Sequence, residues 1–264
     1  MMNGGKKMII GSIAGDIIGS VYEQNNVKSV DFKLFSEKSK FTDDSVLTLA
    51  TMYALLNGKG YTETYQSFGR NYPHRGYGGN FSYWIYLKDP KPYNSWGNGS
   101  AMRVSPIGWY CDDINDVLNE AKKSAEVTHN HPEGIKGAQA TAVAVYMART
   151  GEKKEDIKKN IMDMFQYDLE RKIDDIRPNY EFDVSCQGSV PEAIIAFLES
   201  TDFENAIRLA ISIGGDSDTI ACITGGIAEA YYQVIPESIV ENVLKILPEE
   251  LINLVVEFST RYRK

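Results

Sequence analysis

The sequence lacks a disulfide framework. Its three cysteines in 264 residues, Cys111, Cys186 and Cys222, are widely spaced and contain no CxxC pair. An odd, dispersed set is typical of buried thiols in a reducing compartment. A chain near 300 residues needs no cross-links, because it buries roughly 75% of its unfolded surface. The apolar run near the start is broken by Asp16 and is too short to cross a bilayer. We therefore expect a cytoplasmic protein with no membrane partner.

The sequence also lacks positive charge. Lysine and arginine number 28 against 36 aspartates and glutamates, so the formal net charge is −8. This balance argues against nucleic acid as a partner, which usually requires a basic face. It leaves open a nucleotide-like ligand, whose phosphates can be held by backbone amides and a metal. No exposed apolar stripe indicates self-association, so a monomer is expected.

Strand signals are nearly absent. Only Val30, Phe32 and Leu34 alternate, and no second run could pair with them. Apolar residues instead recur with helical spacing. No linker, low-complexity tract or charge block divides the chain, so we expect a single compact all-α domain spanning residues 1–264. The predicted helices cover residues 45–57, 113–127, 135–146, 157–165, 191–199, 203–212, 218–233, 237–246 and 249–260.

A further helix is predicted at the start, where Gly11, Gly15 and Gly19 recur every four residues. Glycine costs a helix about 1 kcal/mol relative to alanine, so three at one spacing need a reason. Close packing against another helix or a ligand touching the backbone would supply it. Asp16 and Glu23 are seven residues apart and share a face if this helix continues that far.

Two aspartate-rich clusters lie about 170 residues apart, at 42–45 (TDDS) and 214–219 (GGDSDT), and each precedes a predicted helix. Helix capping explains one acidic residue at each start. It does not explain two, because neighbouring like charges repel unless a cation separates them. Four carboxylates with threonine hydroxyls form an all-oxygen site suited to Mg²⁺ or Mn²⁺. The fold must then bring early and late helices together.

Five motifs, in this order, resemble the ADP-ribosylglycohydrolase family, which includes the dinitrogenase-reductase-activating glycohydrolases. They are 11–19 (GSIAGDIIG), 41–45 (FTDDS), 97–103 (GNGSAMR), 128–134 (THNHPEG) and 214–221 (GGDSDTIA). The resemblance implies an all-α domain with two Mg²⁺ or Mn²⁺ ions in a central cleft. It also implies hydrolysis of the bond between ADP-ribose and an acceptor, either an ADP-ribosylated protein or a small ADP-ribose conjugate.

The resemblance assigns roles to individual residues. Glu23 and Asp44 are the candidate catalytic residues, with Glu23 assisting the leaving group. The expected metal ligands are Thr42, Asp43, Asp44, Asp216, Asp218 and Thr219. The expected substrate-binding residues are Asn94, Ser95, Trp96, Gly97, Asn98, Gly99, Ser100, Met102 and His129. Each has a structural alternative: the glycine stretch as a tight turn, Trp96 as a cover for the core, and Glu23 as a solvated surface residue.

Two other functions remain open on the sequence alone. A two-metal phosphoesterase or pyrophosphatase would share the all-oxygen site and act on similar ligands. A non-catalytic ADP-ribose-binding or structural member of the fold is the other. The sequence gives no rule for the acceptor, so arginine-linked, serine-linked, O-acetyl and nucleobase-linked ADP-ribose all remain candidates.

Overall fold

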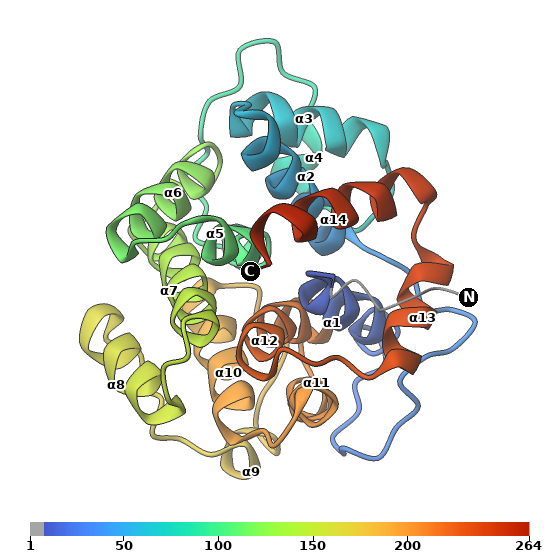
Figure 1. Ribbon diagram of the computed structural model, residues 1–264, viewed down its shortest axis with the longest axis vertical. Helices are drawn as coiled ribbons and strands as arrows, with labels where there is room; N and C mark the ends of the chain where they lie inside the picture. The colour runs from blue at the N-terminus through green and yellow to red at the C-terminus, as the bar shows by residue number, and fades with distance from the viewer. Residues whose placement is uncertain (1–7, 264) are drawn as a thin grey trace.

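The computed structural model of the protein describes residues 8–263, and within this range the chain forms helices and no strands. The all-α prediction is confirmed (Figure 1). The helices are α1 (Gly11–Gly19), α2 (Asp43–Asn57), α3 (Tyr61–Asn71), α4 (Gly79–Trp84), α5 (Ser105–Tyr110), α6 (Ile114–Glu126), α7 (Pro132–Arg149), α8 (Lys154–Phe165), α9 (Ile173–Ile176), α10 (Cys186–Glu199), α11 (Phe203–Ser212), α12 (Ser217–Tyr232), α13 (Glu237–Ile246) and α14 (Glu249–Tyr262), with a short 3₁₀ helix η1 (Asn98–Ser100).

The long amphipathic helices were predicted within a few residues of their observed bounds. The clearest miss among them is α10, predicted from residue 191 but starting at Cys186, where the Ser185 side chain accepts from the Gly188 backbone N–H. The helix continues through Pro191 after this cap. Helices α3, α4, α5 and α9 were not predicted, because three are short and α3 is polar on much of its surface.

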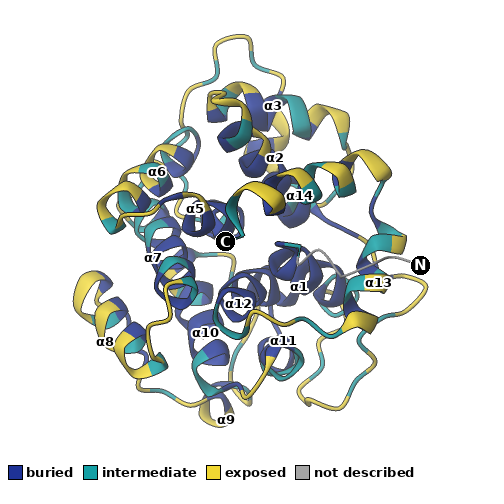
Figure 2. Cartoon of the chain, in the orientation of Figure 1, coloured by how far each residue is buried: buried dark blue, intermediate teal, exposed yellow. Residues whose placement is uncertain are grey.

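Helices α1 and α12 lie side by side at the centre of the molecule (Figure 1). Helices α10 and α11 pack against α12, and α7 joins this group on its other side. Figure 2 shows that the central helices are almost wholly buried, whereas outer helices such as α6, α8 and α14 expose one face. This arrangement places the glycine-rich helix α1 and the helix that begins in the second aspartate cluster, α12, at the middle of the core.

The glycine stripe of α1 permits this central contact. A Cβ added to Gly15 would lie 2.0 Å from the Ala221 carbonyl oxygen of α12, and one added to Gly11 would lie 2.4 Å from the Gly225 oxygen. A Cβ added to Gly19 would likewise lie 2.5 Å from the Cα atom of Asp218. The prediction of close helix packing is confirmed, and the partner is α12. Helix α1 ends at Gly19, so Glu23 lies in the following turns and not on its face.

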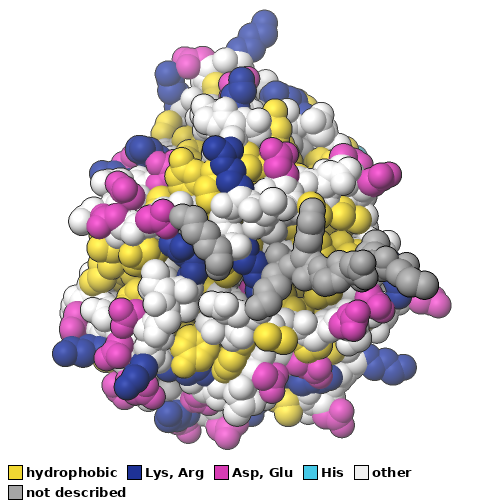
Figure 3. Space-filling view, viewed as in Figure 1, with side chains coloured by type: hydrophobic (Ala, Val, Ile, Leu, Met, Phe, Trp, Pro, Cys, Tyr) yellow, Lys and Arg dark blue, Asp and Glu magenta, His cyan; other side chains and the backbone are white. Residues whose placement is uncertain are grey.

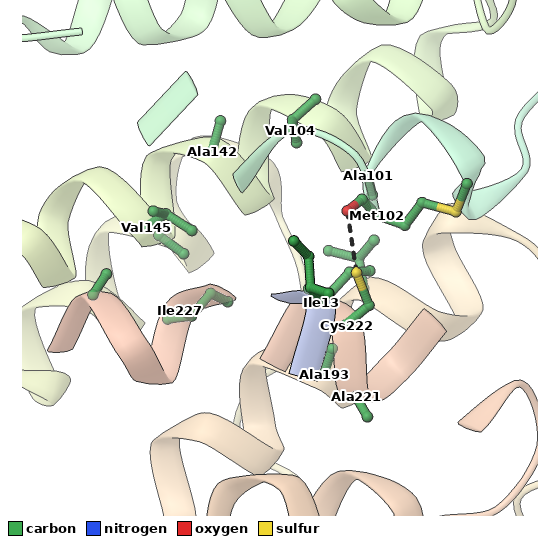
Figure 4. Close-up of a cluster of buried hydrophobic side chains, with 14 of the residues drawn as sticks. Ile13, Ala101, Met102, Val104, Ala142, Val145, Ala193, Ala221, Cys222 and Ile227 are labelled. Atoms are coloured by element: carbon green, nitrogen blue, oxygen red, sulfur yellow. Dashed lines mark hydrogen bonds between the residues drawn. The ribbon is translucent and has the colours of Figure 1, made fainter. Parts of the chain in front are cut away.

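Small and aliphatic side chains fill the core around this contact, among them Ile13 of α1, Ala142 of α7 and Ala193 of α10 (Figure 4). Cys222 donates its S–H to the Met102 carbonyl oxygen at 3.3 Å, which joins α12 to the segment after η1. All three cysteines are free and buried, as the sequence indicated. No helix within residues 8–263 has both the length and the apolarity needed to span a bilayer. Figure 3 shows acidic and basic side chains interspersed over one outer face.

Candidate functional site

The two aspartate clusters meet, because the N-termini of α2 and α12 converge. Asp43 and Asp44 occupy the first turn of α2, after the N-cap residue Thr42. Asp218 and Thr219 occupy the first turn of α12. The Thr219 hydroxyl donates to Asp44 Oδ2 at 3.4 Å across the junction. Acidic side chains at helix N-termini are stabilised by the helix dipole, so both helices favour anionic groups at this point.

The turn before α12 requires glycine. Gly214 and Gly215 have φ values of +79° and +69°, in the left-handed region that side chains with a Cβ rarely adopt. Two consecutive residues in this conformation reverse the chain after α11, so that Asp216 and α12 begin at the cleft. Gly214 and Gly215 are therefore needed for the backbone conformation of the turn that leads into α12.

Asp16 fixes the start of α2 and is the principal residue that the sequence analysis left without a role. It is fully buried in α1 and accepts hydrogen bonds from the backbone N–H of Thr42 at 2.9 Å and of Ser45 at 3.1 Å. The hydroxyls of both residues also donate to it, that of Thr42 at 2.6 Å. The signal available in the sequence was an aspartate inside an otherwise apolar, glycine-rich helix.

The carboxylates form two overlapping groups. Oxygens of Asp16, Asp44 and Asp218 lie within 4.8 Å of one another, and so do oxygens of Glu23, Asp216 and Asp218. Burial, followed by the neighbouring carboxylates, raises the pKa of Asp44 and of Asp218 well above the ordinary value. So many acids in one buried place are unfavourable unless positive charge compensates them.

The donor set fits a divalent cation. Every candidate ligand atom is an oxygen, which is the preference of Mg²⁺ and Mn²⁺. The Oδ1 atom of Asp44 is buried and has no hydrogen-bond partner among the described residues. A buried carboxylate oxygen without a partner is costly, and a metal ion would satisfy it. The shared Asp218 is consistent with a carboxylate that serves two neighbouring cation positions.

Glu23 reaches this site from the turns after α1. The Asn26 side chain holds these turns, because its Nδ2 donates to the Glu23 carbonyl oxygen at 2.9 Å and to the Gly215 oxygen at 3.1 Å. Its Oδ1 accepts from the Gly215 N–H at 2.7 Å. Burial and the nearby Asp216 raise the pKa of Glu23. Asn26 therefore connects the Glu23 segment to the glycine turn that carries Asp216.

A cleft of about 380 Å³ opens over the carboxylates. It is within the size range of small-molecule sites. Most of the residues predicted from the sequence line it, namely Glu23, Thr42, Asp43, Asp44, Ser95, Gly97, Asn98, Gly99, Met102, His129, Asp216, Asp218 and Thr219. Asn98 also contacts the acidic cluster directly, since its Nδ2 donates to Asp216 Oδ2 at 2.7 Å.

Three predicted substrate-binding residues lie outside the lining. Asn94 is exposed and its backbone N–H donates to Asn130 Oδ1 at 2.8 Å. Trp96 is 52% exposed and packs edge-on against His131. Ser100 is fully buried behind the loop and donates to the Gly134 oxygen at 2.7 Å. Neighbouring residues in a tight loop point in different directions, so a whole motif does not face one cavity.

The cleft has further lining residues besides the predicted catalytic, metal-binding and substrate-binding ones. Arg75 lies over the Phe41 ring at 3.6 Å, and its carbonyl oxygen accepts from the Asp43 N–H at 2.9 Å. Phe182 and Val184 are more than half exposed and form an apolar part of the rim. Their sequence signal was weak, because they lie in an irregular segment without periodicity. Together, the fold and the cleft define an all-helical protein with an oxygen-donor site where two helix N-termini meet.

Comparison with known proteins identifies the family. The model of the ADP-ribosylglycohydrolases matches residues 5–264, nearly the whole sequence. The chain therefore belongs to the ADP-ribosylglycohydrolase family, as its motifs had indicated. A solved structure described as an ADP-ribosylglycohydrolase-related protein complex has the same fold, with a TM-score of 0.68, 24% identity and coverage of 97% of both chains.

Several curated proteins are similar over most of their length. ADP-ribosylhydrolase ARH3 of Mus musculus is 28% identical over 312 residues, covering 87% of this chain and 84% of the relative. The ARH3 of Homo sapiens is also 28% identical, with 87% and 86% coverage. A putative ADP-ribosyl glycohydrolase of Acanthamoeba polyphaga mimivirus is 27% identical and covers 90% of each chain.

Proposed function

We propose that this protein is a metal-dependent hydrolase that cleaves the glycosidic bond between ADP-ribose and an acceptor. Family membership supports the reaction class. The observation that carries the proposal is the buried group of carboxylates in the cleft, with the unpartnered Asp44 Oδ1 among them. A protein that only bound ADP-ribose would have no need to keep five buried or half-buried acids around one point.

The ligands in this proposal are Thr42, Asp43, Asp44, Asp216, Asp218 and Thr219, with Asp16 placing the first three. The two ions, Mg²⁺ or Mn²⁺, would supply a water of lowered pKa and positive charge beside the substrate hydroxyls. Asp16 is held by four hydrogen bonds, and these fix the first turn of α2 before any ligand binds. Preorganisation of this kind reduces the cost of assembling a site.

Glu23 and Asp44 divide the proton transfers. The raised pKa of Glu23 favours its protonated form, which suits an acid that donates to the departing oxygen or nitrogen. Asp44 lines the cleft, and in this proposal its carboxylate holds both a metal ion and the attacking water, whose proton it can accept. Glycoside cleavage proceeds through an oxocarbenium-like transition state and generally uses two such carboxyl groups.

The glycine loop completes the substrate site. Gly97 and Gly99 line the cleft without side chains, so that phosphate or ribose oxygens can approach the backbone closely. Asn98 lies between them and contacts Asp216, which joins the ligand-facing loop to the acidic cluster.

The test measures release of free ADP-ribose from arginine-linked and serine-linked ADP-ribosyl proteins, with Mg²⁺ and with excess chelator. We expect chelator-sensitive release from one of them, and the substrate that reacts identifies the acceptor class. Chromatographic detection of phosphate or a mononucleotide in place of ADP-ribose would instead support the phosphoesterase. Binding of ADP-ribose without release from any conjugate would support the non-catalytic member.

Asp43→Ala is the most informative variant, because Asp43 lines the cleft and its carboxylate makes no hydrogen bond to another segment among the described residues, so its removal leaves the tertiary contacts in place. We expect turnover to fall by at least a thousandfold while the protein stays folded. Asp89→Ala is the matched control, since Asp89 is exposed and paired only with exposed Lys91. Full activity of Asp43→Ala with metal binding intact would refute the metal-ligand assignment.

A further inference from the structure

His129 lies beneath the glycine loop at the wall of the cleft. It is 6% exposed, and a Cβ added to Gly99 would lie 3.2 Å from its Nε2, with one on Gly97 at 3.6 Å. The Nε2 atom therefore faces the loop that lines the cleft. Whether Nε2 donates or accepts a hydrogen bond depends on which ring nitrogen carries the proton.

The other ring nitrogen has a defined partner. Nδ1 of His129 lies 2.7 Å from the Thr128 hydroxyl oxygen. The same oxygen accepts from Arg103 Nη2 at 3.0 Å, and Arg103 also donates to the Ser124 carbonyl oxygen at 2.7 Å. Arginine has five donors and no acceptor and stays charged, so the direction of the Arg103–Thr128 hydrogen bond is certain. The Thr128 hydroxyl keeps its own proton for another acceptor.

Two acceptors among the described residues are within reach of that proton, His129 Nδ1 and the oxygen of the Tyr93 phenol. Burial raises the pKa of Tyr93 to about 12, so the phenol keeps its proton and can itself donate to Thr128. The chain of donors then runs from Arg103 to Thr128 and from Thr128 to Nδ1.

We propose that Arg103 and Thr128 are positioning residues that hold His129 in the tautomer with its proton on Nε2. The Nε2–H group then donates into the cleft and selects an oxygen acceptor, such as a phosphate or ribose oxygen of the ligand. Burial and the Arg103 charge lower the pKa of His129 well below its usual range, so the ring stays neutral. The tautomer follows from the hydrogen bonds of Thr128 and from the protonated Tyr93 phenol, whereas its role toward ADP-ribose rests on the proposed function.

Burial of Arg103 strengthens the inference. Its side chain is fully buried above the Tyr65 ring, at 4.3 Å, and its Nε and Nη1 atoms have no hydrogen-bond partner among the described residues. Burying an unpaired cation is costly, and replacing it with an apolar residue would often be neutral or stabilising. A role in orienting the Thr128 hydroxyl gives this cation a function.

Nitrogen NMR of the ¹⁵N-histidine-labelled apoprotein tests the tautomer directly. The chain has three histidines, so the signals of His74 and His131 are assigned by replacing each in turn. We expect His129 to show a protonated Nε2 and an unprotonated, hydrogen-bonded Nδ1. A protonated Nδ1 overturns the proposal, whether or not the protein proves to be a hydrolase.

Variants of Thr128 test the positioning role. Thr128→Val keeps the shape but removes the hydroxyl, and Thr128→Ser restores it. We expect the valine variant to lose the hydrogen-bond shift of Nδ1 and to bind ADP-ribose roughly three- to tenfold more weakly by calorimetry, with serine restoring both. Tyr93→Phe is the control, and it should leave the tautomer of His129 unchanged.

An Nδ1 signal and an ADP-ribose affinity equal to wild type in Thr128→Val would overturn the positioning role. A change of tautomer in Tyr93→Phe would show that the Thr128 proton is directed to Tyr93 and would overturn the proposed donor chain. If the wild-type protein does not bind ADP-ribose, the proposed function fails, while the nitrogen spectrum still decides the tautomer.

Discussion

Replacing Gly15 with alanine tests whether the contact between α1 and α12 builds the site. The new Cβ would lie 2.0 Å from the Ala221 carbonyl oxygen and 2.4 Å from its carbonyl carbon. These are backbone atoms in the middle of a helix, so no side-chain rotation relieves the overlap. The two helices must separate by more than about 1 Å to restore an ordinary contact.

The cost follows from this separation. Overpacking of a well-packed core costs typically 1–3 kcal/mol and sometimes more, and a gap of about 1 Å loses up to half of the dispersion energy along the interface. Alanine recovers about 1 kcal/mol of helix propensity. We expect a net loss of about 2 kcal/mol or more, which corresponds to a fall in Tm of roughly 4–8 °C for a chain of this size.

The same displacement should weaken metal binding. Asp16 follows Gly15 directly in α1, and its oxygens lie within 4.8 Å of those of Asp218 in α12. Parting the helices therefore moves one carboxylate of this group away from another. We expect the rise in Tm on adding Mg²⁺ or Mn²⁺ to be smaller in Gly15→Ala than in the wild type.

Gly69→Ala is the matched control. It places the same substitution inside α3, where the new Cβ would meet only side-chain atoms at 3.0 Å or more, namely Ile85 Cγ2 at 3.0 Å and Ile85 Cδ1 and Phe81 Cε1 at 3.4 Å, and no backbone atom among these nearest ones. We expect a change in unfolding free energy within about 1 kcal/mol and no change in the metal effect. A Gly15→Ala protein as stable as the wild type, with a full metal response, would refute the reasoning.

Three further predictions concern the site and its supports. The raised pKa values of Asp44 and Asp218 mean that the folded state binds protons more tightly than the unfolded state, so we expect the metal-free protein to lose stability as pH rises from about 3.8. Added Mg²⁺ should therefore raise Tm more at pH 7 than at pH 5. A metal-free stability that increases over this range would contradict the assignment. Gly99→Ala places a methyl group 3.2 Å from His129 Nε2, so this variant should bind ADP-ribose about tenfold more weakly by calorimetry. Gly60→Ala is the control, because its Cβ would meet no atom within 4 Å, and it should bind ADP-ribose as the wild type does. Equal affinities of the two variants would show that the ligand does not contact this wall of the cleft. Arg263→Met leaves the fully buried Glu229 without its ion-pair partner, although Glu229 still accepts from the Ile10 N–H at 2.8 Å. We expect this variant to lose roughly 3–5 kcal/mol of unfolding free energy in denaturant, whereas Arg261→Met, at an exposed position, should lose under 1 kcal/mol. Similar small losses in both variants would refute the importance of this ion pair.

The sequence predicted most of the fold because helical periodicity is a local signal. Helices α11 and α13 have the predicted bounds, and α2, α6 and α12 differ by only one or two residues at an end. The helices that were missed lack that signal. Helix α9 has four residues, and α4 and α5 have six each, so none completes the repeats that would reveal an apolar face.

The candidate site was predicted unevenly for a similar reason. The doubled aspartates were visible because two like charges at one helix start are more than capping needs. Asp16 was assigned no role because a single residue within an apolar segment carries no pattern. Trp96 was selected as part of a motif, and the structure places it outside the cleft, where it is 52% exposed and packs against His131.

The sequence by itself determined the all-helical class, the two acidic helix starts and the oxygen chemistry of the site. Only the tertiary structure decided that Asp44, Asp216 and Asp218 lie beside Asp16 and Glu23, and that Asn26 ties the Glu23 turn to the turn before α12. Periodicity and capping depend on residues within a few positions of each other. The convergence of α2 and α12 depends instead on the glycine contacts of α1 with α12, about 200 residues away in sequence, and on the hydrogen bonds of Asp16 to the start of α2. The glycine spacing predicted close packing, but it could not name the partner helix.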